Sequence, residues 1–195
     1  MSTARLETFS DGVFAIAATL LILDVKLPPD GGVAHGFLHI WPSYAAYALG
    51  FVTIGIMWIN HHTVFACIDR VDRTFLTINV LFLMLIAFVP FPTRVLAEHL
   101  QHDAKAAAFV YGLTMVLMAV LYNALWFYAA IGRRLIAADA DQRTVTGITR
   151  AFIPGVPIYT VATLSALLSS WLSAGLYAAI ALFYVLESSL FGHDE

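Results

Sequence analysis

The sequence has few charged residues and almost no cysteine. Asp, Glu, Lys and Arg together make up 12% of its 195 residues, about half their share in a typical soluble domain. The single cysteine, Cys67, excludes a disulfide within the chain and is expected to be a small packing residue. Signatures of serine hydrolases, phosphate-binding loops and dinucleotide-binding folds are also missing. The sequence therefore predicts a protein that is not an enzyme.

A metal site is not expected either. His61 and His62 are adjacent, so on a helix their side chains point about 100° apart and do not readily bind one ion together. The chain also lacks a His-Glu-x-x-His motif and paired cysteines. We expect the two histidines to form hydrogen bonds between helices instead.

What the sequence has in abundance is apolar residues, which make up 61% of the chain and give a mean hydropathy of +0.82. These values predict an all-α integral membrane protein, because a soluble domain carries far more charge. Long runs without charge indicate six membrane helices in a single domain, with a turn between the last two at Leu172–Gly175. The domain covers residues 1–195, and its expected helices are 4–27, 38–67, 73–97, 105–132, 150–172 and 174–191.

The basic residues predict the orientation of these helices. With six spans, seven basic residues lie on the side of the N-terminus and three on the other side, and cytoplasmic loops are enriched in Lys and Arg. Both termini are therefore expected in the cytoplasm. The seven are Arg5, Arg70, Arg73, Arg133, Arg134, Arg143 and Arg150, and the three are Lys26, Arg94 and Lys105.

The first helix carries an aspartate, Asp11, more than a turn inside it. The charge-free run that follows, Gly12 to Leu23, is shorter than the about 20 residues that a span needs. To span the membrane, the helix must place polar residues inside it, which is costly unless they are paired or hydrated. Such a helix is expected inside a bundle or beside water, and not against lipid.

Helical spacing divides the first helix into two faces. At 100° per residue, an apolar stripe with one hydroxyl gathers around Ile16, while Glu7, Asp11 and Ala18 lie opposite. We expect the carboxylate face to meet polar groups of the second and third spans. The stripe consists of Phe9, Gly12, Ile16, Thr19, Leu20 and Leu23, and the polar groups include Asn60, His61 and Asn79.

The sequence pattern of this helix is compatible with several other interpretations. The stripe is also typical of plain helix packing, with Thr19 bonding back to the Ala15 carbonyl. Asp11 is compatible with a structural ion pair to an arginine or a histidine. It is also compatible with a proton relay through His61 and His62 in a proton-conducting or proton-coupled transporter. A small membrane enzyme or assembly factor would need a polar pocket built from several helices.

Three motifs resemble the transmembrane protein 175 family of endolysosomal and prokaryotic potassium channels. The first is the run Arg5…Phe9-Ser10-Asp11-Gly12-Val13-Phe14-Ala15-Ile16-Ala17-Ala18-Thr19-Leu20-Leu21, which resembles the first-helix signature. The others are Trp58-Ile59-Asn60-His61-His62 and Asn79…Leu85-Ile86-Ala87-Phe88-Val89-Pro90-Phe91-Pro92-Thr93, which are similar to motifs of the second and third helices. Together they cover roughly the first half of the chain.

The resemblance implies a homotetramer of six-helix subunits around a central pore lined by the first helix. It places a hydrophobic ring on Ile16 and a hydroxyl ring on Thr19, with Leu20 and Leu23 extending the apolar lining. It also implies a polar network that holds the helix in place. The lining residues are then Gly12, Ile16, Thr19, Leu20 and Leu23, and the network residues are Arg5, Ser10, Asp11, Asn60 and His61.

The function that the resemblance implies is passive conduction of potassium in preference to other cations. Ala15 stands where some relatives have a serine, so one hydroxyl is missing beside the constriction and weak to moderate selectivity is expected. No bound cofactor is expected apart from permeating potassium ions. The expected partners are monovalent cations, membrane lipid and further copies of the chain, but no nucleic acid. The single-repeat length favours a prokaryotic plasma membrane.

Overall fold

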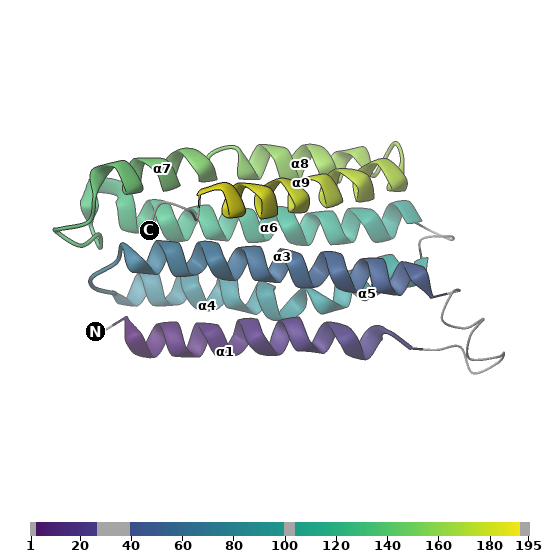
Figure 1. Cartoon of the computed structure of the whole chain (residues 1–195), viewed down its shortest axis with the longest axis horizontal. Coiled ribbons are helices and arrows are strands. Elements are labelled where there is room, and N and C mark those ends of the chain that lie inside the picture. The colour runs from purple at the N-terminus through teal and green to yellow at the C-terminus, as the bar shows by residue number, and fades with distance from the viewer. Residues whose placement is uncertain (1–2, 27–39, 100–103, 192–195) are drawn as a thin grey trace.

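The computed structural model describes residues 3–26, 40–99 and 104–191 of the chain, with side chains up to residue 184. These residues form one bundle of helices whose long axes run side by side (Figure 1). The α-helices are α1 (Ala4–Leu20), α3 (Trp41–Ala66), α4 (Arg73–Phe88), α5 (Pro90–His99), α6 (Ala104–Ala130), α7 (Gln142–Phe152), α8 (Gly155–Ser165) and α9 (Ser170–Phe191). Two short 3₁₀ helices, η1 (Leu21–Asp24) and η2 (Ile131–Arg133), extend α1 and α6.

The elements confirm the all-helical membrane architecture. Among the described residues, four stretches are long and apolar enough to cross a membrane: Ala4–Asp24, Trp41–Ala66, Arg73–His99 and Ala104–Arg133. The third of them joins α4 to α5. The last two of the six predicted helices correspond to α7 with α8, and to α9.

Proline and glycine explain where the helices are interrupted. Pro90 separates α4 from α5 and Pro154 separates α7 from α8, because proline lacks the N–H that a continuous helix needs. Gly132 breaks the helical conformation within η2 with a φ of 64°, in the left-handed region that glycine adopts without a Cβ penalty. Pro42 lies in the first turn of α3, where the missing N–H costs nothing.

Aspartate side chains begin two of the helices. The Asp72 carboxylate accepts a 2.9 Å hydrogen bond from the backbone N–H of Phe75 at the start of α4. Asp141 accepts one of 3.1 Å from the N–H of Thr144 at the start of α7. Each bond satisfies a donor that the first helical turn leaves free.

The core of the bundle is centred on α6, which contacts α4, α5, α8 and α9. Its inward side chains include Tyr111, Met115, Met118 and Trp126, all of which are almost completely buried. Cys67, at the end of α3, is also buried. It is a free thiol in the core, as the sequence predicts.

The predicted turn at Leu172–Gly175 is wrong. These residues lie inside α9, and the connection from α8 is formed by residues 166–169. A hydrogen bond of 2.9 Å from the N–H of Ser169 to the carbonyl of Ser165 closes this connection. The fifth helical segment also begins at Gln142, earlier than the expected residue 150. The predicted starts of the second and fourth helices differ little from the observed ones, although residues 38 and 39 lie outside the described residues.

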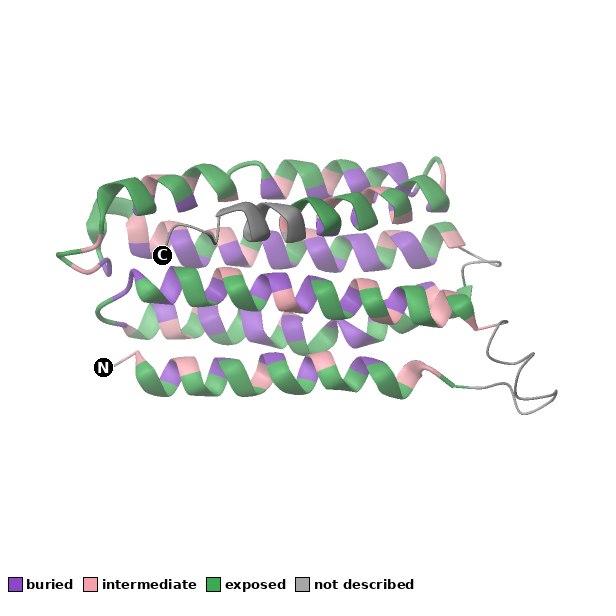
Figure 2. Cartoon of the chain, in the orientation of Figure 1, coloured by how far each residue is buried: buried purple, intermediate pink, exposed green. Residues whose placement is uncertain are grey.

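The two outer helices of the chain have opposite positions in the bundle. Helix α1 lies along one edge, where it contacts α3 and α4, and the α7–α8 segment lies along the other (Figure 1). Helix α1 begins, and α9 ends, at the same end of the bundle. Along α1, buried residues alternate with a larger set of exposed ones (Figure 2).

Candidate functional site

The predicted stripe of α1 is exposed on the single chain. Ile16 has 62% of its surface exposed, and Phe9, Leu20 and Leu23 are exposed as well. Gly12 lies on the same face, and a Cβ at that position would meet no atom within 4 Å. A row of large apolar side chains without cover indicates contact with lipid or with another protein surface.

Thr19 is the hydroxyl on this exposed face. Its Oγ1 lies 3.0 Å from the carbonyl oxygen of Ala15 and 2.9 Å from that of Ile16. The hydroxyl proton is therefore directed to the backbone of its own helix, as plain helix packing predicts. Because the proton is used there, the lone pairs of the oxygen remain free to accept from water or to face a cation.

A third side of α1 packs into the protomer. Leu6, Ser10, Phe14 and Ala17 are its buried residues, and Leu21 of η1 is buried as well. The ring of Phe14 lies 5.3 Å from the ring of His61 and 6.1 Å from that of Phe82. Ala17 keeps the side chain at this contact small, which permits close approach of helices.

A buried chain of hydrogen bonds joins α1, α4 and α3. The side-chain amide of Asn79 donates to the Ser10 hydroxyl at 3.2 Å. The Asn79 amide oxygen accepts from Nε2 of His61 at 3.0 Å, and the Ser10 hydroxyl donates to the Leu6 carbonyl at 2.8 Å. All three side chains are buried, so each finds its partner inside the protein as buried polar groups require.

Asp11 has a different partner from the expected ion pair. Its carboxylate accepts a 2.8 Å hydrogen bond from the indole N–H of Trp58 on α3. Asp11 is exposed, and His61 turns to Asn79 instead. His62 stacks on Trp58 at 6.4 Å. Within the described part of the chain, no direct hydrogen bond connects Asp11 to either histidine.

Two residues predicted for the polar network lie outside it. Arg5 is exposed near the start of α1, and Asn60 faces a cavity between α3, α6 and α7. Neither side chain forms a hydrogen bond or an ion pair within the described residues. Asn60 precedes His61, and successive residues of a helix point about 100° apart, so only one of the two faces α1.

Asn79 and Trp58 belong to the site but were not among the predicted network residues, although the sequence placed Asn79 among the polar groups that the first helix is expected to meet. Asn79 is the centre of the buried chain, and Trp58 holds Asp11. The signal for Asn79 was a lone amide within an otherwise apolar helix, since such a group must find a partner. Trp58 gave a weaker signal, because tryptophan is also common at membrane interfaces.

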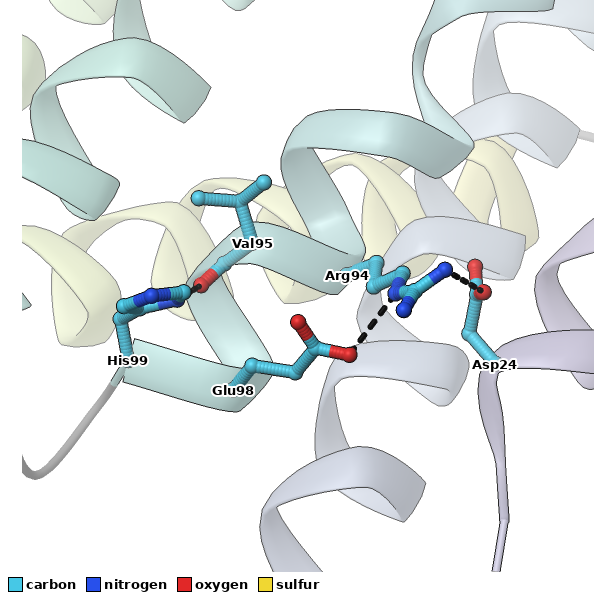
Figure 3. Close-up of polar contacts among 5 residues, drawn as sticks. All are labelled: Asp24, Arg94, Val95, Glu98 and His99. Carbon is cyan, nitrogen blue, oxygen red and sulfur yellow. Dashed lines mark hydrogen bonds and ion pairs between the residues drawn. The ribbon is translucent and has the colours of Figure 1, made fainter.

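At the other end of α1, an ion-pair cluster ties the helix to α5. Arg94 lies between two carboxylates, 3.7 Å from Asp24 and 2.7 Å from Glu98 (Figure 3). The His99 ring bonds to the Val95 carbonyl at 3.0 Å in the next turn. Because Asp24 directly follows Leu23, this cluster fixes the end of the exposed apolar face.

Comparison with known proteins places this geometry in a family. A family profile described as the endosomal/lysosomal potassium channel TMEM175 matches residues 5–90, which contain α1 and the buried hydrogen-bond chain. A protein of Chamaesiphon minutus named as a potassium channel is 43% identical over 193 residues, covering 96% of this chain and 95% of that protein. The chain belongs to the TMEM175 family.

Other TMEM175 relatives agree over nearly the full length. A protein of Streptomyces collinus, also named as a potassium channel, is 43% identical and covers 93% of this chain and 91% of its own. The crystal structure of a lysosomal potassium-selective channel TMEM175 homologue from Chamaesiphon minutus superposes with a TM-score of 0.87. That match has 41% identity and covers 95% of this chain and 97% of the other. This TMEM175 chain is therefore an integral membrane protein.

Proposed function

We propose that the protein is a potassium-preferring cation channel that conducts passively through a pore at the centre of a homotetramer. In this arrangement the exposed face of α1 from each subunit lines the pore. The names of the two bacterial relatives and the potassium-selective homologue with the same fold support this proposal. No cofactor takes part, and the permeating species are monovalent cations.

The observation that carries the proposal is the exposed apolar face of α1. Helix α1 lies at the edge of the protomer, with Ile16 turned away from its own bundle. The buried face, by contrast, is tied to α3 and α4 by the Ser10–Asn79–His61 chain. Around a symmetry axis, the exposed faces of several copies would cover one another and enclose a narrow path.

The residue types on this face suggest how such a path works. A ring of Ile16 side chains wets poorly and can close by dewetting, while Leu20 and Leu23 continue the apolar lining. An ion that passes the ring must lose part of its water. The Thr19 oxygens, with their protons directed to the backbone, replace some of that water. Potassium gives up its hydration more readily than sodium, so the ring favours potassium without excluding sodium.

The charges on the connecting segments support an orientation. Arg70 donates to the Arg134 carbonyl at 3.2 Å, which joins the α3–α4 connection to the end of α6. Both lie at the end of the bundle where α1 begins (Figure 1). Lys105 and Arg94 belong to the opposite end. Because basic residues favour the cytoplasmic side, we propose that both termini are cytoplasmic, in a prokaryotic plasma membrane.

Ion flux into liposomes tests the proposal. Ile16→Asn is expected to raise potassium flux several-fold and to lower the preference for potassium over sodium, since a polar ring wets more easily. Val161→Asn is the matched control, because Val161 on α8 is 63% exposed at the other edge of the bundle. Equal flux in wild type and in the assembled Ile16→Asn protein would exclude Ile16 from the path.

Cross-linking tests the position of α1 independently of flux. In a Cys67→Ala background, Ile16→Cys is expected to form disulfides between subunits on oxidation, because side chains around a narrow axis come within disulfide range. Val161→Cys is expected to form none. Monomeric Ile16→Cys after oxidation of an assembled sample would place α1 away from the axis.

A further inference from the structure

A cavity of about 250 Å³ lies on the other side of the protomer from the exposed face of α1. It is a partly open cavity lined by α3, α6, α7, α8 and Tyr184 of α9, and most of its surface is apolar. Ile148 and Phe152 supply part of its apolar wall. An engineered cavity of about 150 Å³ holds benzene. By the same scale, this cavity has room for roughly ten non-hydrogen atoms.

Three polar side chains around this cavity have unused hydrogen-bonding capacity. Tyr122 is 5% exposed, and its hydroxyl has no hydrogen-bond partner within the described residues. Asn60 forms no side-chain hydrogen bond there. Asn123 donates to the Ala119 carbonyl at 2.9 Å, which leaves its amide oxygen free. Buried polar groups without partners are rare in folded proteins, so the buried Tyr122 hydroxyl points to a missing hydrogen-bonding molecule. The half-buried Asn60 and Asn123 offer further donors and acceptors beside it.

The cavity is uncharged. None of the described residues that line it is Asp, Glu, Lys, Arg or His. A charged ligand would have no counter-ion in this membrane-embedded space, and an unpaired charge there is costly. An uncharged ligand with a hydroxyl group would instead find both donors and acceptors in the two asparagines and the tyrosine.

Gly155 keeps part of the space open. It is buried, yet a Cβ at this position would meet no atom within 4 Å. It follows Pro154 at the break between α7 and α8, where the helix begins anew. A side chain at Gly155 would therefore project into free volume, and not into the packed core.

We propose that this cavity binds an uncharged single-chain amphiphile, with a hydroxyl head near Asn60, Tyr122 and Asn123 and a short hydrocarbon body against Ile148 and Phe152. Few polar groups in a mostly apolar cavity are typical of sites for small amphipathic ligands. The ligand reaches the site from the membrane. The site is independent of the proposed pore, since it lies on the opposite side of α3 from α1.

Photolabelling tests this site. The probe is an eight-carbon alcohol that carries a photoreactive diazirine, applied to the full-length protein in lipid nanodiscs and located by mass spectrometry of peptides. Label is expected on the segments that contain Tyr122 and Gly155. Excess 1-octanol is expected to remove it, whereas excess octanoate, which has a charged head, is expected to leave most of it.

Two variants separate specific binding from general contact with lipid. Gly155→Leu fills the cavity and is expected to abolish label at the site, while label on the exposed Val161 of α8 stays unchanged. Tyr122→Phe keeps the ring between Phe82 and Phe152 but removes the hydroxyl. Loss of one hydrogen bond predicts roughly fivefold weaker labelling.

Three results would overturn the proposal. The first is site label that persists in a Gly155→Leu protein with the elution volume of wild type. The second is competition by octanoate as strong as that by 1-octanol. The third is equal labelling of Tyr122→Phe and wild type, which decides the question if Gly155→Leu fails to fold.

Discussion

The indole N–H of Trp58 on α3 and the carboxylate of Asp11 on α1 form a 2.8 Å hydrogen bond between residues 47 positions apart. The bond lies at the boundary between the buried side of α1 and its exposed face. On the buried side, the Ser10–Asn79 bond holds the same helix. With two side-chain contacts on adjacent sides, the rotation of α1 about its own axis is fixed, and so is the direction of Ile16.

Loss of the Trp58 hydrogen bond should therefore loosen α1. Trp58→Phe is expected to lower the free energy of unfolding by about 1 kcal/mol, because a bond to a charged group is strong but this one is exposed. Trp171→Phe is a control, since Trp171 is an exposed tryptophan that stacks on Trp41. Thermal unfolding of the solubilised protein measures both. Equal losses of unfolding free energy in the two variants would mean that the smaller aromatic ring, and not the lost hydrogen bond, causes the effect.

Breaking the buried Ser10–Asn79–His61 hydrogen-bond chain should destabilise the protein more than breaking the exposed bond between Trp58 and Asp11. Asn79→Ala leaves the His61 ring and the Ser10 hydroxyl with one partner fewer and is expected to destabilise the protein by about 1–3 kcal/mol. Ser10→Ala is expected to cost less, because part of the loss is a local bond to the Leu6 carbonyl. A double-mutant cycle of the two in thermal unfolding should give a coupling of about 0.5 kcal/mol or more. Additive losses would contradict a direct interaction.

Helical periodicity follows from residue order alone, so the sequence was sufficient to group the exposed stripe of α1. The exposed positions of Ile16 and Thr19 agree with that grouping. The sequence did not predict that the side through Ser10 and Phe14 is buried and that Asp11 is exposed. The partners were harder to predict, because they depend on which side of α3 faces α1. Asn60 and His61 are adjacent, and only the packed structure selects His61 for the network and Asn60 for the cavity.

The connection between α8 and α9 shows a second limit. Glycine near the middle of an apolar run suggested a turn, but Gly175 lies within α9, and its missing side chain leaves open space. The true connection uses serines, with Ser173 donating to the Ala162 carbonyl at 2.8 Å across it. Serine side chains that bond to the backbone favour helix ends, but serine is too frequent in this part of the sequence to single out one position.

Asp72 should make stability depend on pH in the acid range. The Phe75 N–H and the Tyr128 hydroxyl, which donates at 2.7 Å, lower the pKa of Asp72 below its ordinary value of 3.8. A carboxylate with a lowered pKa in the folded protein stabilises it above the ordinary pKa and loses that effect as pH falls below about 4. Thermal unfolding measured from about pH 6 down to about pH 3 should show this loss in wild type.

Substitution of Asp72 distinguishes its contribution to the pH dependence of stability from that of other carboxylates. Asp72→Asn retains a good N-cap but should have a weaker dependence on pH than wild type. Asp69→Asn, with the same change in charge three residues earlier, should retain the dependence of wild type. If Asp72→Asn follows the wild-type curve throughout, another carboxylate is responsible.

Two glycine substitutions should have opposite effects on stability. A Cβ at Gly112 on α6 would lie 2.6 Å from the Tyr177 hydroxyl and 2.7 Å from the Thr163 hydroxyl, which bond to each other at 2.7 Å. Gly112→Ala must therefore separate α6 from α8 and α9, and should cost about 1–3 kcal/mol. Gly175→Ala meets open space within α9 and should stabilise by about 0.5–1 kcal/mol through better helix propensity. The free energy of unfolding of both variants, measured in the same detergent, tests this prediction. Stabilisation by Gly112→Ala would mean that α6 packs less closely against α8 and α9 than these distances indicate.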